Sequence, residues 1–237
     1  RRVVEFDRIS DETSQILHEA GLQGYQFIRQ FRNPAARGCV LSGASTSDLF
    51  KAPGENFDHV IHLKRINDLR RINKFFETVN HKLAPGGVFI SHVEVYHKKK
   101  DKIMAAYPSG LNTLIYGFYY LFTRVFPKLP LSKQLFFLTT RGHNRVLSST
   151  ETLGRLYSCG FEVTGETFIN GYHYFACRKV KEPAYDTHPT FGMIIRLKRI
   201  GKNGELINVY KLRTMHAYAE YLQPYIYRKC KLADGGK

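Results

Sequence analysis

The sequence predicts an α/β fold with a mostly parallel sheet and an antiparallel hairpin at its edge. Short apolar runs typical of strands alternate with amphipathic segments of helical spacing between residues 38 and 160. Two further strand-like runs are joined by Ile169-Asn170-Gly171, and Asn-Gly is the strongest short hairpin signal. The 237 residues are 43% hydrophobic, which allows one large or two small domains with a buried core.

The first half of the chain contains the expected parallel strands. Ser10 is the expected N-cap of a first helix, with Asp11 and Glu12 in its first turn and Gly21 at its end. The next expected elements are strands at 39–41 and 57–63, an amphipathic helix at about 66–83 and a strand at 88–95. This alternation is typical of βαβ units, which place parallel strands side by side.

The second half of this domain closes the predicted sheet. Ser148-Ser149-Thr150-Glu151 is a capping-box pattern that predicts a helix to about Cys159, and Gly160 is its expected end. Strands are expected at 161–168 and 172–180. Because a two-residue turn joins them, they predict an antiparallel edge.

These elements resemble a known enzyme class. The run VLSGASTSDLFKAPGENFDHVIHL, followed by a helix and LAPGGVFI, looks like the second half of a class I SAM-dependent methyltransferase. The resemblance covers about residues 38–180 and implies a Rossmann-like sheet. Members of that class carry a glycine-rich loop for SAM, and this sequence has no GxGxG; Ala44 and Ser45 stand where an acidic adenine contact is usual. We therefore expect a methyltransferase-like domain at 1–180 and no SAM cofactor, with an active SAM methyltransferase of a sugar or lipid intermediate as the alternative.

Residues 96–147 form an insertion with an unusual composition. A basic run is followed by 103–123, which contain no charged residue and are rich in tyrosine and phenylalanine. Aromatic residues between basic flanks are typical of an element that lies in a lipid headgroup layer. The expected membrane contacts are Lys98, Lys99, Lys100, Tyr116, Phe118, Tyr119, Tyr120 and Phe122. The alternative is a lid helix whose aromatic residues pack on the sheet beside a solvated basic run.

The C-terminal part, after a polar linker at 181–190, contains a second motif. Lys211 and Arg213 alternate on a predicted strand, so they point to one face and would repel each other without an anion between them. Arginine and lysine together suit a diphosphate. The alternative without a binding role is a β-hairpin whose charged side chains are solvated, with a tight turn at 201–204.

This motif resembles the start of the bacterial sugar transferase family, the polyprenol-phosphate phosphoglycosyl transferases. The matching residues are Arg199, Ile200, Gly201, Gly204, Tyr210, Lys211, Arg213, Thr214 and Met215, whereas Leu212 and Met193 depart from the usual Phe and Pro. The resemblance implies transfer of a sugar phosphate from a UDP-sugar to polyprenol phosphate, with Mg²⁺, at the cytoplasmic face of the bacterial inner membrane. It also implies phosphate contacts from Arg199, Lys211 and Arg213.

The resemblance also implies what the chain should lack. Residues 191–237 are expected to be the truncated start of such a domain, since the family's catalytic Asp-Glu dyad lies further downstream. Asp11-Glu12 is the only such pair, and its place at a helix start explains it better. We therefore expect no catalytic residue in this chain and no phosphoglycosyl transferase activity from it alone.

Charge and cysteine content limit the partners. The formal charge is +16, which favours anionic partners, and an anionic membrane surface is preferred because no nucleic-acid-binding signature is present. The four cysteines are scattered without a metal-binding spacing, so no metal site is expected in this chain. A non-catalytic peripheral membrane scaffold is the third functional alternative.

Overall fold

The structure is a computed structural model that describes residues 2–43, 49–50, 54–185 and 194–230. Its helices are α1 (Arg2–Phe31), α3 (Ile72–Lys82), α4 (Tyr96–Ala106), α5 (Leu111–Tyr120), α6 (Pro130–Thr140), α7 (Ser149–Ser158) and α8 (Gln223–Cys230). Its strands are β1 (Gly38–Leu41), β2 (Phe57–Arg65), β3 (Leu83–Glu94), β4 (Phe161–Ile169), β5 (Tyr172–Lys179), β6 (Ile194–Ile200) and β7 (Leu206–Leu212). Short turns of helix are η1 (Ile66–Asp68), η2 (Leu121–Val125), η3 (Phe126–Lys128), η4 (Lys202–Gly204) and η5 (Ala219–Leu222).

The five-stranded sheet has the order β1-β2-β3-β5-β4. The pairs β1–β2 and β2–β3 are parallel, and β5 is antiparallel to both β3 and β4. Four strands therefore run in one direction and β5 runs against them, which confirms the predicted α/β fold with a mostly parallel, methyltransferase-like sheet. β1 is an edge strand, because no described strand lies on its other side.

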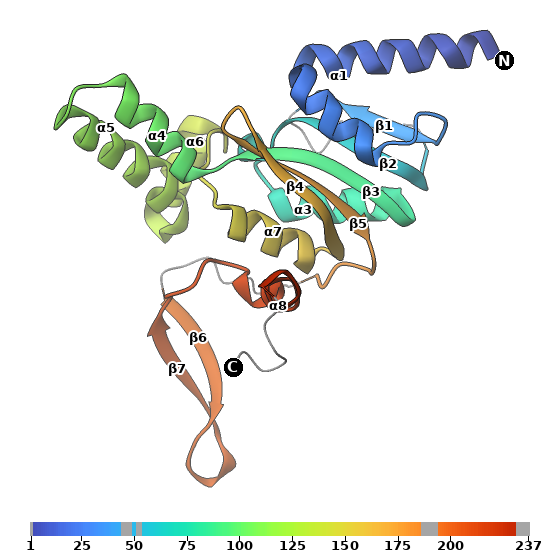
Figure 1. Cartoon of the computed structure of the whole chain (residues 1–237). Helices are drawn as coiled ribbons and strands as arrows, with labels where there is room; N and C mark the ends of the chain where they lie inside the picture. The colour runs from blue at the N-terminus through green and yellow to red at the C-terminus, as the bar shows by residue number, and fades with distance from the viewer. Residues whose placement is uncertain (1, 44–48, 51–53, 186–193, 231–237) are drawn as a thin grey trace.

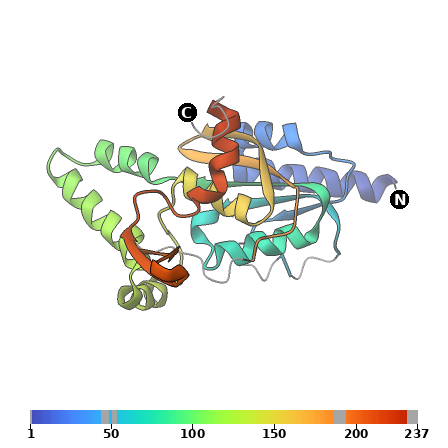
Figure 2. The same cartoon turned by 90° about the horizontal axis from the view of Figure 1, so that it is seen from below.

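Helices cover both faces of this sheet (Figures 1 and 2). On one face, α1 buries Ile16, Phe27 and Ile28 against Ile61 and Ile90 of the central strands. On the other face, α3 and α7 bury the larger part of the core. Because β2 and β3 are apolar on both faces, they fit the pattern of strands that lie between two helical layers.

Phe89 of β3 lies at the centre of the larger core. Its side chain is 0% exposed, and its ring centroid lies 5.8–6.1 Å from those of Phe75, Phe76, Phe161 and Phe175. Tilted and edge-to-face rings at this spacing are favourable beyond the area they bury. One side chain thus links α3, β3, β4 and β5.

The local sequence signals explain several boundaries. Ser148 caps α7 and its hydroxyl accepts a hydrogen bond from the Glu151 amide at 3.1 Å, as the capping box predicts. Asn170 and Gly171 both have positive φ, the geometry of the predicted tight hairpin turn.

Two predicted helix boundaries were wrong. The first helix extends through Ser10 in both directions, so Ser10 is no N-cap, although Gly21 does break the helix with φ 69°. The helix expected at 66–83 begins only at Ile72, because the residues after β2 form η1 and use polar side chains to bond the neighbouring loops.

The β6–β7 hairpin forms as predicted and projects away from the main sheet (Figure 1). Beyond it, the chain returns to the α/β domain, where Ala217, Tyr218 and Leu222 are each 2% exposed. The Asn73 amide donates to the Tyr218 hydroxyl at 2.7 Å, and the Arg155 guanidinium lies 4.6 Å from the centre of the Tyr218 ring. The sequence did not indicate this return. The contact requires glycine at position 154, because a Cβ there would lie 2.3 Å from the Tyr218 carbonyl oxygen.

A half-buried carboxylate also attaches α8 to the sheet. Glu166 of β4 accepts hydrogen bonds from His173 at 3.0 Å, from Tyr225 at 2.7 Å and from Lys229. The bond from His173, with those from Lys229 and Tyr225, lowers the pKa of Glu166 to about 2 despite its partial burial. Glu162, two residues earlier, pairs with Arg228 of the same helix.

Replacing Phe89 by alanine should destabilise the protein strongly, because it removes a side chain that contacts four other aromatic rings. We expect the F89A variant to lose about 3–5 kcal/mol of unfolding free energy and to melt about 6–20 °C lower. Phe118→Ala is the control, since that side chain is 74% exposed. A melting temperature of F89A within 2 °C (roughly the effect of a surface substitution) of the control would contradict this packing.

Acid should weaken the attachment of α8. The folded pKa of Glu166 lies below its usual value of 4.5, so its stabilisation is present at neutral pH and is lost as the pH falls from about 4.5 toward 2. We expect Glu166→Gln to lower the unfolding free energy at pH 7 by about 1.5–3 kcal/mol, with the difference from wild type shrinking toward pH 2. Urea unfolding from pH 7 to pH 2 measures this, and Glu205→Gln in the exposed hairpin is the control. If the difference in unfolding free energy between Glu166→Gln and wild type stays constant from pH 7 to pH 2, ionised Glu166 does not stabilise the attachment of α8.

Candidate functional site

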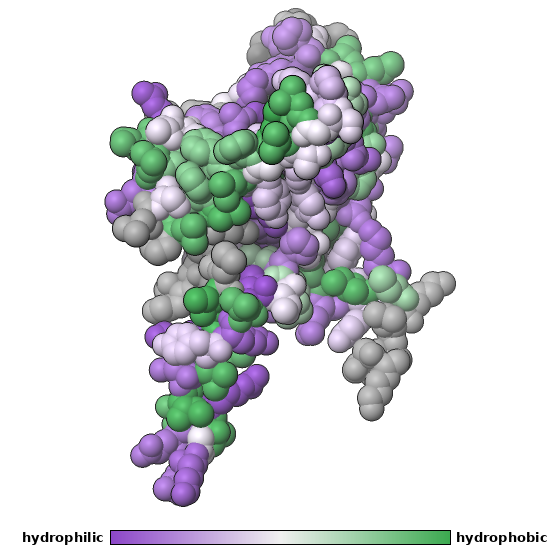
Figure 3. Space-filling view, turned by 90° about the vertical axis from the view of Figure 1, so that its left-hand side faces the viewer, coloured by the Kyte–Doolittle hydropathy of each residue, from purple (hydrophilic) through white to green (hydrophobic). Residues whose placement is uncertain are grey.

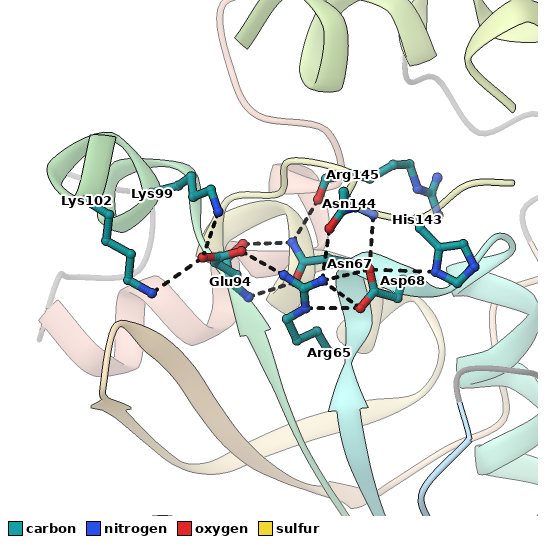
Figure 4. Close-up of polar contacts among 9 residues, drawn as sticks. All are labelled: Arg65, Asn67, Asp68, Glu94, Lys99, Lys102, His143, Asn144 and Arg145. Carbon is teal, nitrogen blue, oxygen red and sulfur yellow. Dashed lines mark hydrogen bonds and ion pairs between the residues drawn. The ribbon is translucent and has the colours of Figure 1, made fainter. Parts of the chain in front are cut away.

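The parallel strands β1, β2 and β3 end at one rim of the sheet, where α/β folds bind their ligands. Figure 4 shows the polar residues that gather there at the ends of β2 and β3. They come from three separate segments: the end of β2 with η1, the end of β3 with α4, and the loop before α7. The sheet therefore brings together side chains that are far apart in the sequence.

Asn67 of η1 joins these three segments. Its side-chain oxygen accepts from the Glu94 amide at 2.7 Å, and its side-chain nitrogen donates to the carbonyls of Glu94 and Arg145, each at 2.8 Å. The Asn67 side chain is 3% exposed and forms three hydrogen bonds to backbone groups. Because buried backbone groups without partners are costly, Asn67 fixes the end of β3 and the returning loop relative to β2.

Arg65, the last residue of β2, adds a charged layer. Its guanidinium donates to both oxygens of Asp68 at 3.0 and 3.1 Å, to Glu94 at 3.0 Å and to the Asn144 side chain at 2.9 Å. The planar fork of arginine suits such a two-oxygen contact. Asp68 also accepts from the Asn144 amide at 3.0 Å, so the loop before α7 is held twice.

Glu94, the last residue of β3, connects the rim to the insertion. Besides Arg65, its carboxylate lies 3.7 Å from the Lys99 amine and 3.6 Å from the Lys102 amine, both on α4. The Glu94 side chain is 8% exposed, so three cations surround a nearly buried anion. These pairs orient α4 over the end of β3, as Figure 4 shows.

A small pocket lies between this cluster and the insertion. Its lining residues are Asn67, Glu94, Tyr96, Lys99, Tyr119, Asn144, Arg145 and Val146, and it has room for about one water molecule. Burial lowers the pKa of Arg145 to about 10, which leaves the guanidinium charged at neutral pH. Burial also raises the pKa of the Tyr119 hydroxyl, so it stays protonated. The pocket is thus polar, cationic and bordered by two tyrosines.

The rim near β1 has a different lining. Ser42 follows β1, and its hydroxyl accepts from the Gln15 amide of α1 at 2.6 Å. Glu19, one turn further along α1, pairs with Lys64 of β2 at 2.9 Å. Burial by itself would raise the pKa of Glu19, but hydrogen bonds from Ser42 and Lys64 lower it below its usual value. This part of the rim therefore presents a hydroxyl, an amide and a carboxylate beneath α1.

Two histidines lie between these regions and act as structural groups. His62 is 1% exposed, and its ring nitrogens lie 3.1 Å from the Ser91 hydroxyl and 3.1 Å from the Gly43 carbonyl. It thus ties the residue after Ser42 to β3. Burial, together with the nearby positive charges, lowers the pKa of His92 to about 4, so His92 is neutral at physiological pH.

The predicted phosphate-binding residues lie elsewhere. In the hairpin register, Arg199 pairs with Ile207 and Lys211 with Ile195, so both point to one face but stand about 13 Å apart along the strand. Arg213 follows the end of β7. The structure does not bring these three residues to the polar rim.

The aromatic residues among the predicted membrane contacts divide into two groups. Phe118 and Phe122 are 74% and 38% exposed. Tyr116, Tyr119 and Tyr120 are half-buried and turn toward basic side chains. Among the described residues, no cluster of histidine, cysteine and acidic side chains could hold a metal ion.

Sequence reasoning missed the rim cluster. Arg65, Asn67 and Asp68 directly follow a predicted strand, and Glu94 ends the next one. Polar residues just beyond the carboxyl ends of adjacent parallel strands are the signal that could have identified them. The sequence instead predicts one amphipathic helix at about 66–83, which would make Asn67 and Asp68 part of that helix.

Comparison with known proteins gives a likeness in fold. No protein-family model and no curated protein matches the chain. A solved complex between the Haloferax volcanii Trm112 methyltransferase activator and a protein described as a methyltransferase aligns with a TM-score of 0.43 and 10% identity, covering 74% of this chain and 95% of the other. A SAM-dependent methyltransferase of Thermotoga maritima aligns with a TM-score of 0.39 and 14% identity, covering 76% and 96%. At such identities the likeness concerns the fold.

These neighbours correct two expectations. The interpretation of the chain as part of a sugar transferase was wrong: no protein-family model matches the chain, and the two neighbours named above are described as methyltransferases. The motif behind it covers one hairpin, whereas the methyltransferase-like sheet spans 38–179. The exclusion of SAM was wrong for the same reason, and the expectation of Mg²⁺ is dropped with the sugar transferase. UDP-sugar and polyprenol phosphate as partners, and the domain boundary at 181–190, stay predictions.

Removing the Asn67 side chain should loosen the rim. Asn67→Ala leaves the Glu94 amide and two carbonyls without partners, and we expect a loss of about 2–4 kcal/mol of unfolding free energy. Asn208→Ala, in the exposed hairpin, is the matched control and should change stability by less than about 0.5 kcal/mol. Chemical denaturation measures both, and equal stabilities of the two variants would show that Asn67 is not needed.

Proposed function

We propose that this chain is a SAM-dependent methyltransferase that binds its cofactor where β1 ends, beneath α1, and its methyl acceptor beside the insertion. The observation that carries the proposal is the sheet itself. Four strands run in one direction with β5 reversed between β3 and β4, and the three parallel strands end at one polar rim. Ligands of such sheets bind at the carboxyl ends of the strands.

The residues near β1 fit the polar groups of such a cofactor. The Glu19 carboxylate and Ser42 hydroxyl can accept hydrogen bonds from ribose hydroxyls or an ammonium group, and the Gln15 amide can donate to a carboxylate. Gly43 offers an approach without a side chain, and His62 holds its carbonyl in place. Residues 44–48, which follow in the chain, lie outside the described residues. When bound, SAM supplies an electrophilic methyl group to an acceptor's lone pair.

The remaining rim suits the acceptor. Lys99 and Arg145 are cations at the pocket, and Tyr96 and Tyr119 border it. Cations beside aromatic rings favour a substrate that carries both negative charge and an apolar part. Asn67 and Arg65 act as positioning residues, because they hold the segments on which these side chains lie.

Binding of S-adenosylhomocysteine, the demethylated product of SAM, tests the proposal. It carries no phosphate, so the +16 charge of the chain gives it little attraction. We expect calorimetry to detect one site, with an affinity that changes less than about threefold between 50 and 300 mM salt. ATP is the control for attraction by charge alone and should bind weakly and lose affinity as salt rises.

Glu19→Gln should weaken this binding about tenfold, as expected for a lost charged hydrogen bond of about 1.4 kcal/mol. Glu205→Gln, in the exposed hairpin, is the control and should bind like the wild type. Heat from ATP but none from S-adenosylhomocysteine at millimolar concentration would refute the proposed function.

A further inference from the structure

α5 exposes a continuous apolar stripe. Four large hydrophobic residues recur at helical spacing along α5 and the first residue of η2, and each is 45–74% exposed: Leu111, Leu114, Phe118 and Leu121. Positions separated by three and four residues lie on one face of a helix. Surface helices normally pack such an apolar face against the protein core. An apolar stripe that is exposed to solvent therefore indicates a surface that binds a partner.

The opposite face of α5 explains this orientation. Tyr116 and Tyr119 lie beneath Lys100 and Lys99 of α4, with ammonium-to-ring distances of 5.8 and 5.7 Å. Arg124 lies 5.9 Å from the centre of the Tyr120 ring. These cation–π contacts hold the tyrosines inward and leave the leucines outside. The outward stripe is therefore a consequence of how the insertion packs.

The stripe continues onto neighbouring elements. Leu129 before α6 and Phe122 of η2 are each 38% exposed, and Leu135 and Leu138 of α6 are 54% and 79% exposed. Figure 3 views the molecule from the side on which the insertion projects, and hydrophobic residues gather over that face. We call the surface formed by α5, η2 and α6 the apolar face.

Charge identifies the kind of partner. Residues 102–150 contain six lysines and arginines and no aspartate or glutamate. A surface without a carboxylate is not repelled by an anionic layer. The helix α4, which packs on the opposite face of α5, adds Lys98, Lys99, Lys100 and Lys102 against one carboxylate, Asp101. A helix with apolar residues on one side and basic neighbours has the composition of an element lying in a lipid headgroup layer. No helix in the described ranges has the length and apolar character needed to cross a bilayer.

We propose that the apolar face docks onto the surface of an anionic lipid bilayer, with Leu114 and Phe118 inserted at the boundary between headgroups and acyl chains. The net positive charge of the insertion would then attract the anionic headgroups. The helix axis of α5 would lie in the plane of the membrane. This inference does not depend on the proposed function, because it uses only the exposed face of the insertion.

Vesicle co-sedimentation tests the proposal. The full chain should bind vesicles that contain about 30% phosphatidylglycerol in phosphatidylcholine and bind pure phosphatidylcholine at least tenfold less, since several lysines contribute roughly a factor of five each near an anionic surface. The double variant L114S/F118S should lower the partition coefficient for the anionic vesicles at least about tenfold, because two large apolar side chains no longer insert.

The control is I200S/L206S. Ile200 and Leu206 are 78% and 68% exposed and pair across the hairpin, so this variant removes as much exposed apolar surface at another place. It should bind vesicles like the wild type. Circular dichroism should show both double variants folded with unchanged melting temperatures, because all four side chains are exposed.

Three results would overturn the proposal. Equal partitioning of L114S/F118S and wild type would exclude the apolar face as the contact. Loss of binding in the hairpin variant alone would place the contact on β6–β7. A lipid-free dimer in sedimentation velocity that L114S/F118S converts to a monomer would show that a second copy covers this face. Hydrogen exchange on vesicles gives an independent check, with slower exchange expected at 111–122.

Discussion

The strands β2 and β3 end side by side, and the backbone N–H and C=O groups at these ends need hydrogen-bond partners. Asn67 supplies those partners. Its buried side chain forms hydrogen bonds with the Glu94 amide and with the carbonyls of Glu94 and Arg145. Arg65 and Asp68 then add charged bonds to the same three segments. Because buried polar groups are stable only when fully paired, the rim is rigid where these residues meet.

The insertion and the rim are parts of one arrangement. Glu94 orients α4 through Lys99 and Lys102, and the neighbouring lysines Lys99 and Lys100 hold the tyrosines of α5 inward. The same contacts that border the pocket therefore direct the leucines of α5 outward. This links the enzyme proposal and the docking proposal while leaving each open to its own test.

The fold was predictable to the extent that short-range patterns determine it. The alternation of strands and helices, the Ser148 capping box and the Asn170-Gly171 turn all specify local geometry, and they produce the sheet that the sequence indicated. The rim cluster was not predictable in this way, because Arg65, Glu94 and Asn144 meet only once the strands are in register. The return of Tyr218 to α7 is another long-range contact that no local pattern marks. The basic C-terminal motif pointed away from the rim, because Lys211 lies on the exposed strand β7 and Arg213 follows the end of that strand.

The central claim is that the rim at the end of β1 is a cofactor site, and hydrogen exchange with and without S-adenosylhomocysteine tests it most directly. The account predicts slower exchange at residues 38–43 and 12–19 when the ligand is present, with the hairpin at 194–212 unchanged. Exchange that is unaffected throughout, or that slows only in the hairpin, would contradict the claim.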